Sequence, residues 1–227
     1  MLVFARILAP TILSLALWSC SSALRWDADY HVVEPGDTIY SIAFRYDIDQ
    51  QDLRAWNRID GSALIVAGQR LRLQPPEGGA TAAGGSGKSQ PRSSGGTPKP
   101  QVAQQVGWQW PTDGAVIAGY GKSTKTRSGI DIGGKLGQSV RAASAGRVVY
   151  AGDGLPGYGH LLIVKHNNDF LSAYGHNDHL LAKDGDQVKA GQQIARMGEG
   201  PGRRPLLHFE IRLRGEPVNP LNYLPKR

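Results

Sequence analysis

A short segment near the C-terminus alternates chemically active and apolar side chains. It reads Leu206-Leu207-His208-Phe209-Glu210-Ile211-Arg212. Alternate residues of a strand point to opposite faces, so the odd-numbered residues are expected to face the core. The other face then displays His208, Glu210 and Arg212 at the surface, with the apolar Leu206 beside them. Imidazole and carboxylate groups can move protons or bind a metal ion, so this face is the first candidate site.

Two further segments contain residue types that could do chemistry. In 127–132, a strand would place Arg127, Gly129 and Asp131 on one side. Residues 152–157 match the spacing GxGxxG of phosphate-binding loops. Pro156 interrupts that motif, and a strand is expected after it, so no helix N-terminus would face a phosphate. We therefore exclude nucleotide binding there.

The elements that must position these residues are short, glycine-separated strands. Strands are expected at 148–151, 161–165, 170–174 and 206–212. Asn167-Asn168-Asp169 is expected to form a hairpin turn between two of them. This pattern predicts a mostly antiparallel all-β domain, a barrel or a sandwich, over 106–227.

Composition excludes several classes of protein. The 227 residues include 30 Gly and 14 Pro, too many for a helical bundle or a coiled coil. The single cysteine excludes an internal disulfide framework and a multi-Cys zinc site. The net charge is +7, but basic runs are not interleaved with aromatic residues, so we expect no nucleic-acid partner.

The N-terminus is interpreted as a targeting segment. A positive charge at Arg6 precedes a short apolar run, which predicts a signal peptide over 1–19. A bacterial lipobox is resembled by the segment Leu17-Trp18-Ser19-Cys20. The resemblance implies that Cys20 is lipidated and that palmitate is among its acyl chains. Ser21 after the cysteine implies the periplasmic face of the outer membrane by the same resemblance. An ordinary signal peptide with an incidental cysteine is the alternative.

A change of composition divides the mature chain into two domains. Residues 75–105 are rich in Gly, Ser and Pro, with Val102 as the one large apolar residue. Such a segment cannot bury enough surface to fold, so we expect a flexible linker. It separates a small domain at 30–74 from the larger domain at 106–227.

The small domain has the order strand, helix, helix, strand, an α+β arrangement. Asp37 or Thr38 is expected to cap the first helix and Asp49 the second. Tyr30-x-Val32-x-x-Gly36-Asp37-Thr38, Ile42-Ala43, Asn57 and Val66-x-Gly68-Gln69-x-Leu71 together resemble a LysM domain. The resemblance implies peptidoglycan binding between two loops, with Gly36, Asp37 and Thr38 in one, and Ile65 and Val66 in the other. Alternatively, Gly36 and Asp37 serve only as turn and cap.

The large domain resembles the LytM-type (lysostaphin-like) zinc endopeptidases, which cut peptidoglycan cross-links. The similarity is carried by Gly129-Ile130-Asp131-Ile132, Gly157-Tyr158-Gly159, Tyr174-Gly175-His176 and Leu207-His208-Phe209-Glu210-Ile211. It implies a duplicated-hybrid-motif fold. Active members hold zinc through the His and Asp of His-x-x-x-Asp and the last His of His-x-His. The other His of that motif and the His of Tyr-x-His flank the attacking water.

Carried over position by position, the resemblance implies an incomplete site. Arg127 stands at the first ligand position and Leu206 at a catalytic one, while Asp131, His176 and His208 remain. A catalytic zinc needs three protein ligands, and a guanidinium group has no lone pair to donate. We therefore expect no metal, no cofactor and no catalysis, with Asp131, His176 and His208 as relics.

The combination of lipobox, LysM domain, linker and degenerate LytM-type domain resembles NlpD-type lipoproteins. These activate periplasmic N-acetylmuramoyl-L-alanine amidases, which split the septal wall between daughter cells. The resemblance implies that the former active-site groove docks the amidase. The docking residues would be Arg127, Asp131, His176, Leu206 and His208, with added charge from Arg203 and Arg204.

Two other functions stay open. The first is an active zinc endopeptidase with an irregular ligand set, and the second is a wall-tethering lipoprotein without an effector role. Leu206 could anchor a partner or could merely fill the space of the lost metal. Under the degenerate-site interpretation, Arg127→His with Leu206→His would partly restore zinc binding.

Overall fold

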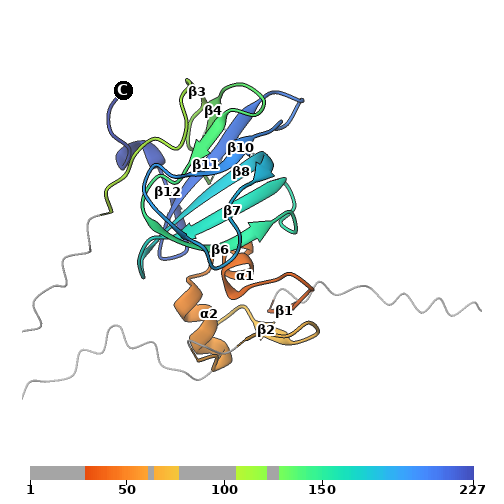
Figure 1. The fold of residues 1–227 in the computed structure, drawn as a ribbon. Helices are drawn as coiled ribbons and strands as arrows, with labels where there is room; N and C mark the ends of the chain where they lie inside the picture. Colours follow the sequence, from red (N-terminus) through yellow and green to blue (C-terminus); the bar gives the residue numbers. More distant parts are fainter. Residues whose placement is uncertain (1–28, 61–63, 77–105, 122–127) are drawn as a thin grey trace, which may run out of the picture.

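The structure is a computed structural model that describes residues 29–60, 64–76, 106–121 and 128–227 (Figure 1). The predicted signal peptide 1–19, Cys20, Arg127 and all but the first two residues of the predicted linker lie outside the described residues. In the part of the chain that is described, no helix is long and apolar enough to cross a membrane.

The small domain has the predicted order of elements. They are β1 (Tyr30–Val32), α1 (Ile39–Arg45), α2 (Gln50–Asn57) and β2 (Arg70–Arg72). Thr38 caps α1, with its side chain accepting from Ser41 N at 3.0 Å, and Asp49 caps α2. The predicted helix boundaries are therefore confirmed, with Thr38 rather than Asp37 at the first cap.

The core of the small domain is a single apolar cluster between the helices and the two-stranded sheet. Its buried members are Val33, Ile39, Ile42, Ala43, Leu53, Leu71 and Leu73. Asn57 ties the last turn of α2 to β2, donating to Arg72 O at 2.8 Å and accepting from Arg72 N at 2.6 Å. The motif asparagine therefore holds helix and sheet together.

The large domain is all-β, as predicted, apart from one 3-10 turn. Its strands are β3 (Val116–Ala118), β4 (Ile130–Gly133), β5 (Ser139–Arg141), β6 (Gly146–Gly152), β7 (His160–Lys165), β8 (Phe170–Leu180), β9 (Gln187–Val188), β10 (Gln193–Met197), β11 (Leu206–Leu213) and β12 (Glu216–Val218), followed by η1 (Pro220–Asn222). The main sheet runs β3-β4-β11-β8-β7-β6-β9, and β10 pairs with both β8 and β5. All pairings are antiparallel.

Two local predictions about this sheet are confirmed. Residues 167–169 form the turn between β7 and β8, where Asn167 Oδ1 accepts from the backbone of Asp169 and Phe170. The GxGxxG segment lies between β6 and β7, so a strand follows it rather than a helix. Strand β8 continues well past the predicted end at Tyr174.

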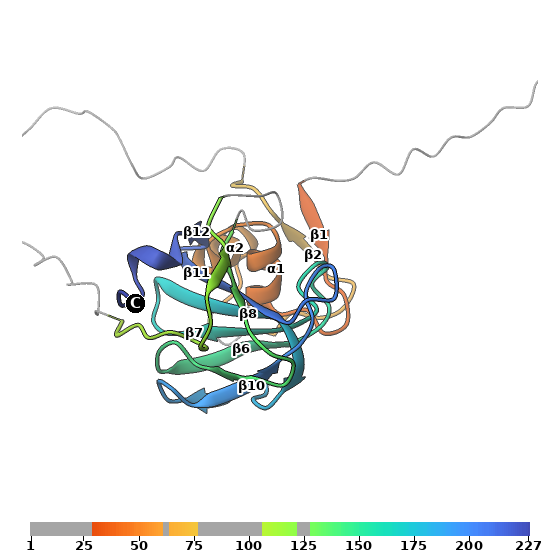
Figure 2. The ribbon, with the colours of Figure 1, turned by 90° about the horizontal axis from the view of Figure 1, so that it is seen from above.

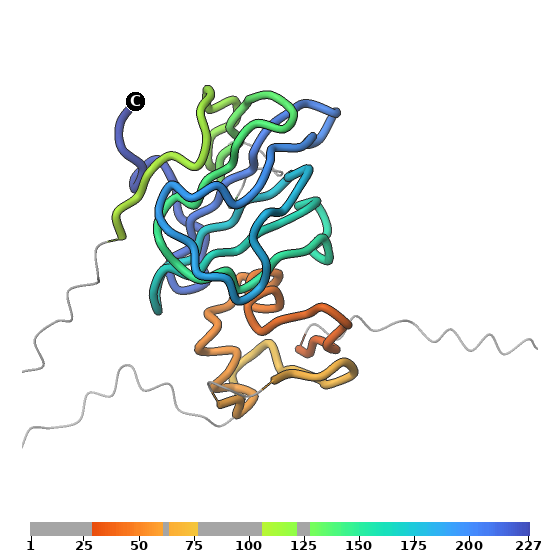
Figure 3. Tube along the Cα trace, viewed as in Figure 1, coloured from red at the N-terminus to blue at the C-terminus, as the bar shows by residue number. Residues whose placement is uncertain are grey.

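The two domains are in contact, which the sequence interpretation did not anticipate. Helix α1 packs beneath β6 (Figures 1 and 3), and in the view from above the two helices overlap the strands of the large domain (Figure 2). Phe44 of α1 belongs to the same buried cluster as Tyr150, Leu161 and Ile163 of the large domain. Thr38 Oγ1 donates to Val149 O at 3.4 Å across the contact.

Candidate functional site

Three adjacent strands bring the predicted site residues together. β11 lies between β4 and β8, and the register places His208 opposite Asp131 on one side and Gly175 on the other. His176, next to Gly175, has its ring 6.2 Å from that of His208, measured between centroids. The sequence prediction that Asp131, His176 and His208 belong to one site is therefore consistent with their positions in the sheet.

His208 is hydrogen-bonded through both ring nitrogens. Nδ1 lies 2.7 Å from Asp131 Oδ1, and Nε2 lies 3.1 Å from Glu210 Oε1. Burial disfavours the charged ring, but the hydrogen bonds and negative charges of Asp131 and Glu210 outweigh it and raise the pKa of His208 to about 9. At neutral pH this residue is an imidazolium ion held between two carboxylates.

The expectation that His208 is displayed at the surface is wrong. Its exposed fraction is 4%, and Glu210 and Arg212 on the same face are also buried. The face is covered because the ring of Tyr158 lies edge-on to His208 at 5.7 Å and the ring of Phe44 lies over Arg212. The alternation of β11 was predicted correctly, but both of its faces are inside the protein.

Glu210 is the centre of a buried polar network. Its carboxylate accepts from the Tyr158 hydroxyl at 2.8 Å and from Arg212 Nε at 2.9 Å, as well as contacting His208. Burial favours the neutral acid, but the charges of Arg212 and His208 prevail and lower the pKa of Glu210. Burial and the neighbouring Glu210 charge raise the pKa of Tyr158, so its hydroxyl stays a donor.

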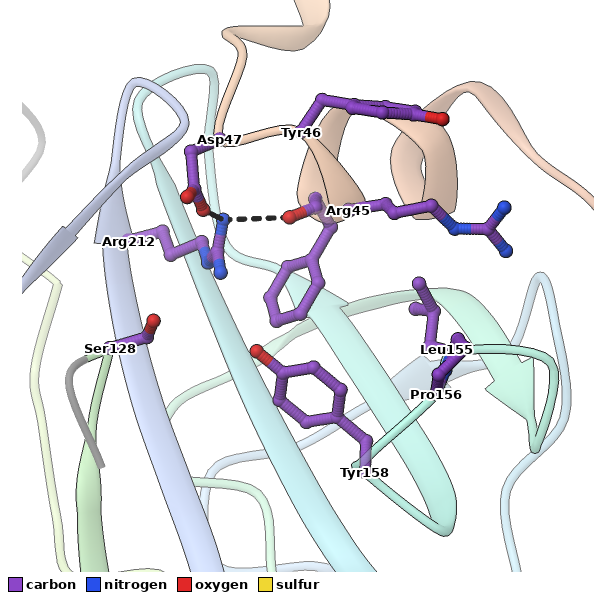
Figure 4. Close-up of a pocket in the computed structure, with 9 residues that line it drawn as sticks. Arg45, Tyr46, Asp47, Ser128, Leu155, Pro156, Tyr158 and Arg212 are labelled. Atoms are coloured by element: carbon purple, nitrogen blue, oxygen red, sulfur yellow. Dashed lines mark hydrogen bonds and ion pairs between the residues drawn. The ribbon is translucent and has the colours of Figure 1, made fainter. Parts of the chain in front are cut away.

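The network continues from the site into the small domain. Arg212 Nη1 donates to Asp47 Oδ1 at 2.6 Å and to Phe44 O at 3.0 Å, and its guanidinium lies 3.6 Å from the Phe44 ring centroid (Figure 4). A cavity of about 440 Å³ adjoins this contact. Charges of alternating sign thus run from Asp131 to Asp47.

The resemblance to LytM-type peptidases implies a zinc ion held by three protein ligands. Zinc needs deprotonated ligands with free lone pairs. Among the described residues, Asp131 and His208 supply two of the three protein ligands that a catalytic zinc requires, and they are hydrogen-bonded to each other. Within the described ranges, no group of three or more His, Cys, Asp or Glu residues could hold a metal ion. The described residues do not fit a zinc site.

Of the two positions at which the resemblance implies a lost site residue, the structure describes Leu206. Arg127 lies outside the described residues. Leu206 is buried, and an added Cβ on Gly200 would meet its side chain at 2.7 Å. Its position fits the space-filling explanation, because a buried leucine offers little surface to a partner. Docking through these residues stays a prediction.

His176 has an unusual backbone conformation. Its φ is 60°, in the left-handed region that non-glycine residues rarely adopt. Its carbonyl accepts from Gly198 N and its amide donates to Tyr158 O, so neighbours on both sides hold it there. Burial, followed by the positive charge of His208, lowers the pKa of His176. Residues held in sparsely populated backbone conformations cluster at functional sites.

The residues predicted to bind sugar lie in two loops of the small domain. Gly36 and Val66 are exposed, and Asp37 accepts from His31 Nε2 at 2.7 Å and Glu34 N at 2.9 Å. Gly36 has φ of 90°, which a turn at this point requires. The turn-and-cap role of Gly36, Asp37 and Thr38 is therefore present, and sugar binding by the loops stays a prediction.

Sequence reasoning missed the partners that complete the network. Glu210 and Arg212 were placed on the correct face of β11 but were given no role. The i, i+2 alternation of charge from His208 to Arg212 was a signal that could have found them. No local pattern pointed to Phe44 or Asp47, because their contact with Arg212 joins residues 165 or more positions apart.

The raised pKa of His208 predicts how stability depends on pH. Protonated His208 stabilises the fold, in full below its ordinary pKa of 6.5, and this stability is lost as the pH rises through about 9. We expect the free energy of unfolding, measured with urea, to decline over this window. The decline should be smaller in His208→Gln. Equal slopes in both proteins would contradict the imidazolium assignment.

Comparison with known proteins identifies two families in the chain. Residues 31–74 match the LysM domain, and residues 125–220 match peptidase family M23. The Lipoprotein NlpD/LppB homolog of Pseudomonas aeruginosa is 43% identical over 229 residues, which cover 87% of this chain and 77% of the relative.

Two further comparisons cover the large domain. The Murein hydrolase activator NlpD of Escherichia coli is 55% identical over 120 residues, 53% of this chain and 32% of that protein. The matched region therefore spans about a third of that relative's length. The antimicrobial peptidase lysostaphin from Staphylococcus simulans shares 29% identity at a TM-score of 0.47, over 52% of each chain.

Proposed function

Because the chain belongs to the NlpD/LppB family of lipoproteins, with a LysM domain followed by an M23 peptidase-like domain, we propose that it binds peptidoglycan and activates a periplasmic N-acetylmuramoyl-L-alanine amidase. The amidase would then split the septal wall between daughter cells. In this proposal the chain itself cuts nothing. It is anchored through Cys20 to the periplasmic face of the outer membrane.

One observation carries the non-catalytic part of the proposal. Asp131 and His208, the two surviving ligand positions, are bonded to each other at 2.7 Å, and His208 is also bonded to Glu210. To bind zinc through Nδ1, His208 would have to lose the proton on that nitrogen and its hydrogen bond to Asp131, while Nε2–H could stay bonded to Glu210. This cost favours an activator over the alternative of an irregular zinc endopeptidase, and relatives named as murein hydrolase activators support the same choice.

The surface around Asp131 and His176 is the proposed docking surface for the amidase. Among the predicted docking residues, Asp131 and His176 keep partial exposure, while Leu206 and His208 are buried. His176 is therefore the described side chain best placed to touch a partner. The buried network beneath it would keep that surface rigid, which lowers the entropy lost on docking.

The test is release of dye from labelled sacculi by the purified chain. We expect no release by the chain alone with zinc supplied, and strong release when a periplasmic amidase of low activity is added. Release by the chain alone would establish a hydrolase and overturn the proposal. If no candidate amidase is stimulated, a wall-tethering role replaces activation.

Two histidines of the same strand offer a matched pair of variants for this assay. His176→Ala should lower amidase stimulation several-fold, because it removes a half-buried ring from the proposed docking surface. His179→Ala should leave stimulation unchanged, since His179 is exposed on β8 at a position paired with Arg196 rather than at the site. If the two variants stimulate the amidase equally, the docking surface does not include His176.

A further inference from the structure

A second cavity lies where the small domain meets β6 and β7. Its volume is about 550 Å³, within the range of about 300–1,000 Å³ that small-molecule pockets occupy. Residues of both domains line it, so it exists only when the domains are in contact. It is separate from the cavity beside Arg212, with which it shares no lining residue.

One wall of this cavity consists of the predicted sugar-binding loops. Asp37, Thr38 and Ile65 line it, together with the exposed Leu64 and the half-buried ring of Tyr40. Apolar side chains and an aromatic ring next to a few polar groups are suited to the faces and hydroxyls of a sugar. The loops are not free at this edge, since Thr38 bonds to Val149 of the large domain.

The opposite wall is cationic. Arg147 on β6 and Lys165 on β7 are directly opposite each other in the sheet register, and both line the cavity. Like charges directly opposite on neighbouring strands repel each other. An anion between them would remove that repulsion. Lys165 Nζ has three hydrogens to donate, and one of them goes to Tyr40 OH at 3.3 Å.

The remaining charges of the lining leave the cavity positive. Arg54 adds a third cation from the small domain, against the carboxylates of Asp37 and Asp184. Asp37 already has partners, His31 at 2.7 Å and Arg45 at 3.7 Å. Three cations against two carboxylates give the lining a net charge of +1, which an acidic ligand would neutralise.

We propose that the large domain completes the sugar-binding site of the LysM domain, and that Arg147 and Lys165 bind a carboxylate carried by the amino-sugar chain. This inference rests on the proposed binding of peptidoglycan. Two carboxylates of that polymer share the required chemistry. One is the lactyl group of a muramic acid whose stem peptide has been removed, and the other belongs to the stem peptide itself.

The experiment compares three tetrasaccharides as ligands of the full chain by calorimetry. Chitotetraose has no carboxylate, a bare GlcNAc–MurNAc tetrasaccharide has free lactyl carboxylates, and the same tetrasaccharide with stem peptides has peptide carboxylates. We expect at least one acidic ligand to bind about tenfold more tightly than chitotetraose, because its carboxylate would form charge-assisted hydrogen bonds with Arg147 and Lys165. The better of the two identifies the source of the carboxylate. High salt should shrink the preference.

Variants separate the cationic wall from the sugar loops. Arg147→Gln with Lys165→Gln should abolish the preference, so that the acidic ligand binds the variant no more tightly than chitotetraose does. Lys189→Gln with Arg196→Gln removes the same charge from exposed positions of the large domain outside the cavity lining, and should change neither affinity.

The outcomes distinguish this inference from the function on which it rests. Equal binding of all three ligands, or an unchanged preference in the Arg147/Lys165 double variant, overturns the composite site while peptidoglycan binding stands. If none of the three ligands binds, peptidoglycan binding by the LysM domain fails, and the composite site fails with it.

Discussion

Replacing Arg212 by alanine should lower the free energy of unfolding by about 4 kcal/mol, the size expected when one partner of a buried ion pair is removed. The side chain of Arg212 is 2% exposed and that of Glu210 is 0% exposed. Among the described residues, the substitution leaves the buried Glu210 carboxylate with His208 as its one cationic partner, and it leaves Phe44 O without that donor. It also removes the stacking of the guanidinium on the Phe44 ring. Urea unfolding of the full chain measures the loss.

Arg214 provides the matched control two residues away. It forms an ion pair with Asp169 at 2.9 Å, but its side chain is 72% exposed. Arg214→Ala should therefore cost no more than about 0.5 kcal/mol. Asp47→Ala, at the exposed end of the network, should fall between the two. Similar costs for the Arg212 and Arg214 variants would show that the buried network contributes little to stability.

Replacing Gly198 by alanine should cost about 3 kcal/mol, at the upper end of what overpacking usually costs. An added Cβ would lie 2.6 Å from Asp178 N, 2.7 Å from Asn177 C and 2.8 Å from His176 O. All three atoms are backbone, so no side chain can rotate away. The clash pushes on His176, whose backbone is already in the left-handed region. Thermal and urea unfolding measure the destabilisation.

The control for this prediction is Gly107→Ala. Gly107 is exposed, and an added Cβ there meets nothing within 4 Å. Its substitution should change the free energy of unfolding by less than about 0.5 kcal/mol. A Gly198 variant as stable as the Gly107 variant would mean that β8 and the loop after β10 move apart easily. The position of His176 would then not be fixed by packing.

Strand β11 shows how far the sequence predicts this fold. The alternation over 206–212 identified the strand, its core-facing side and the residues sharing the opposite side. It could not reveal that the opposite side is also covered, because the cover comes from Tyr158 in a loop and Phe44 in another domain. Period-2 patterns report which residues share a face, but not what lies against that face.

The internal structure of the small domain was predicted from the sequence, but its contact with the large domain was not. Its caps, its helices and the order of its elements follow from local spacing, because short-range hydrogen bonds and one apolar stripe determine them. The contact with the large domain rests on single residues such as Phe44 and Asp47, which local patterns do not distinguish from ordinary helix-end residues. The resemblance to LytM-type peptidases identified Asp131, His176 and His208 as site residues, whereas the network of His208 with Glu210, Tyr158 and Arg212 was found in the structure.

The segment that connects the two domains limits how far apart they can move. The 29 residues between Pro76 and Val106 can span at most about 100 Å when fully extended. If the small domain leaves the large one while holding a glycan strand, the large domain can search only within that radius. Reassociation is then a first-order process within one molecule, so its rate is independent of how many copies the cell contains. Because the two domains are covalently connected, binding of the small domain at one point of the wall confines the large domain to the region around that point.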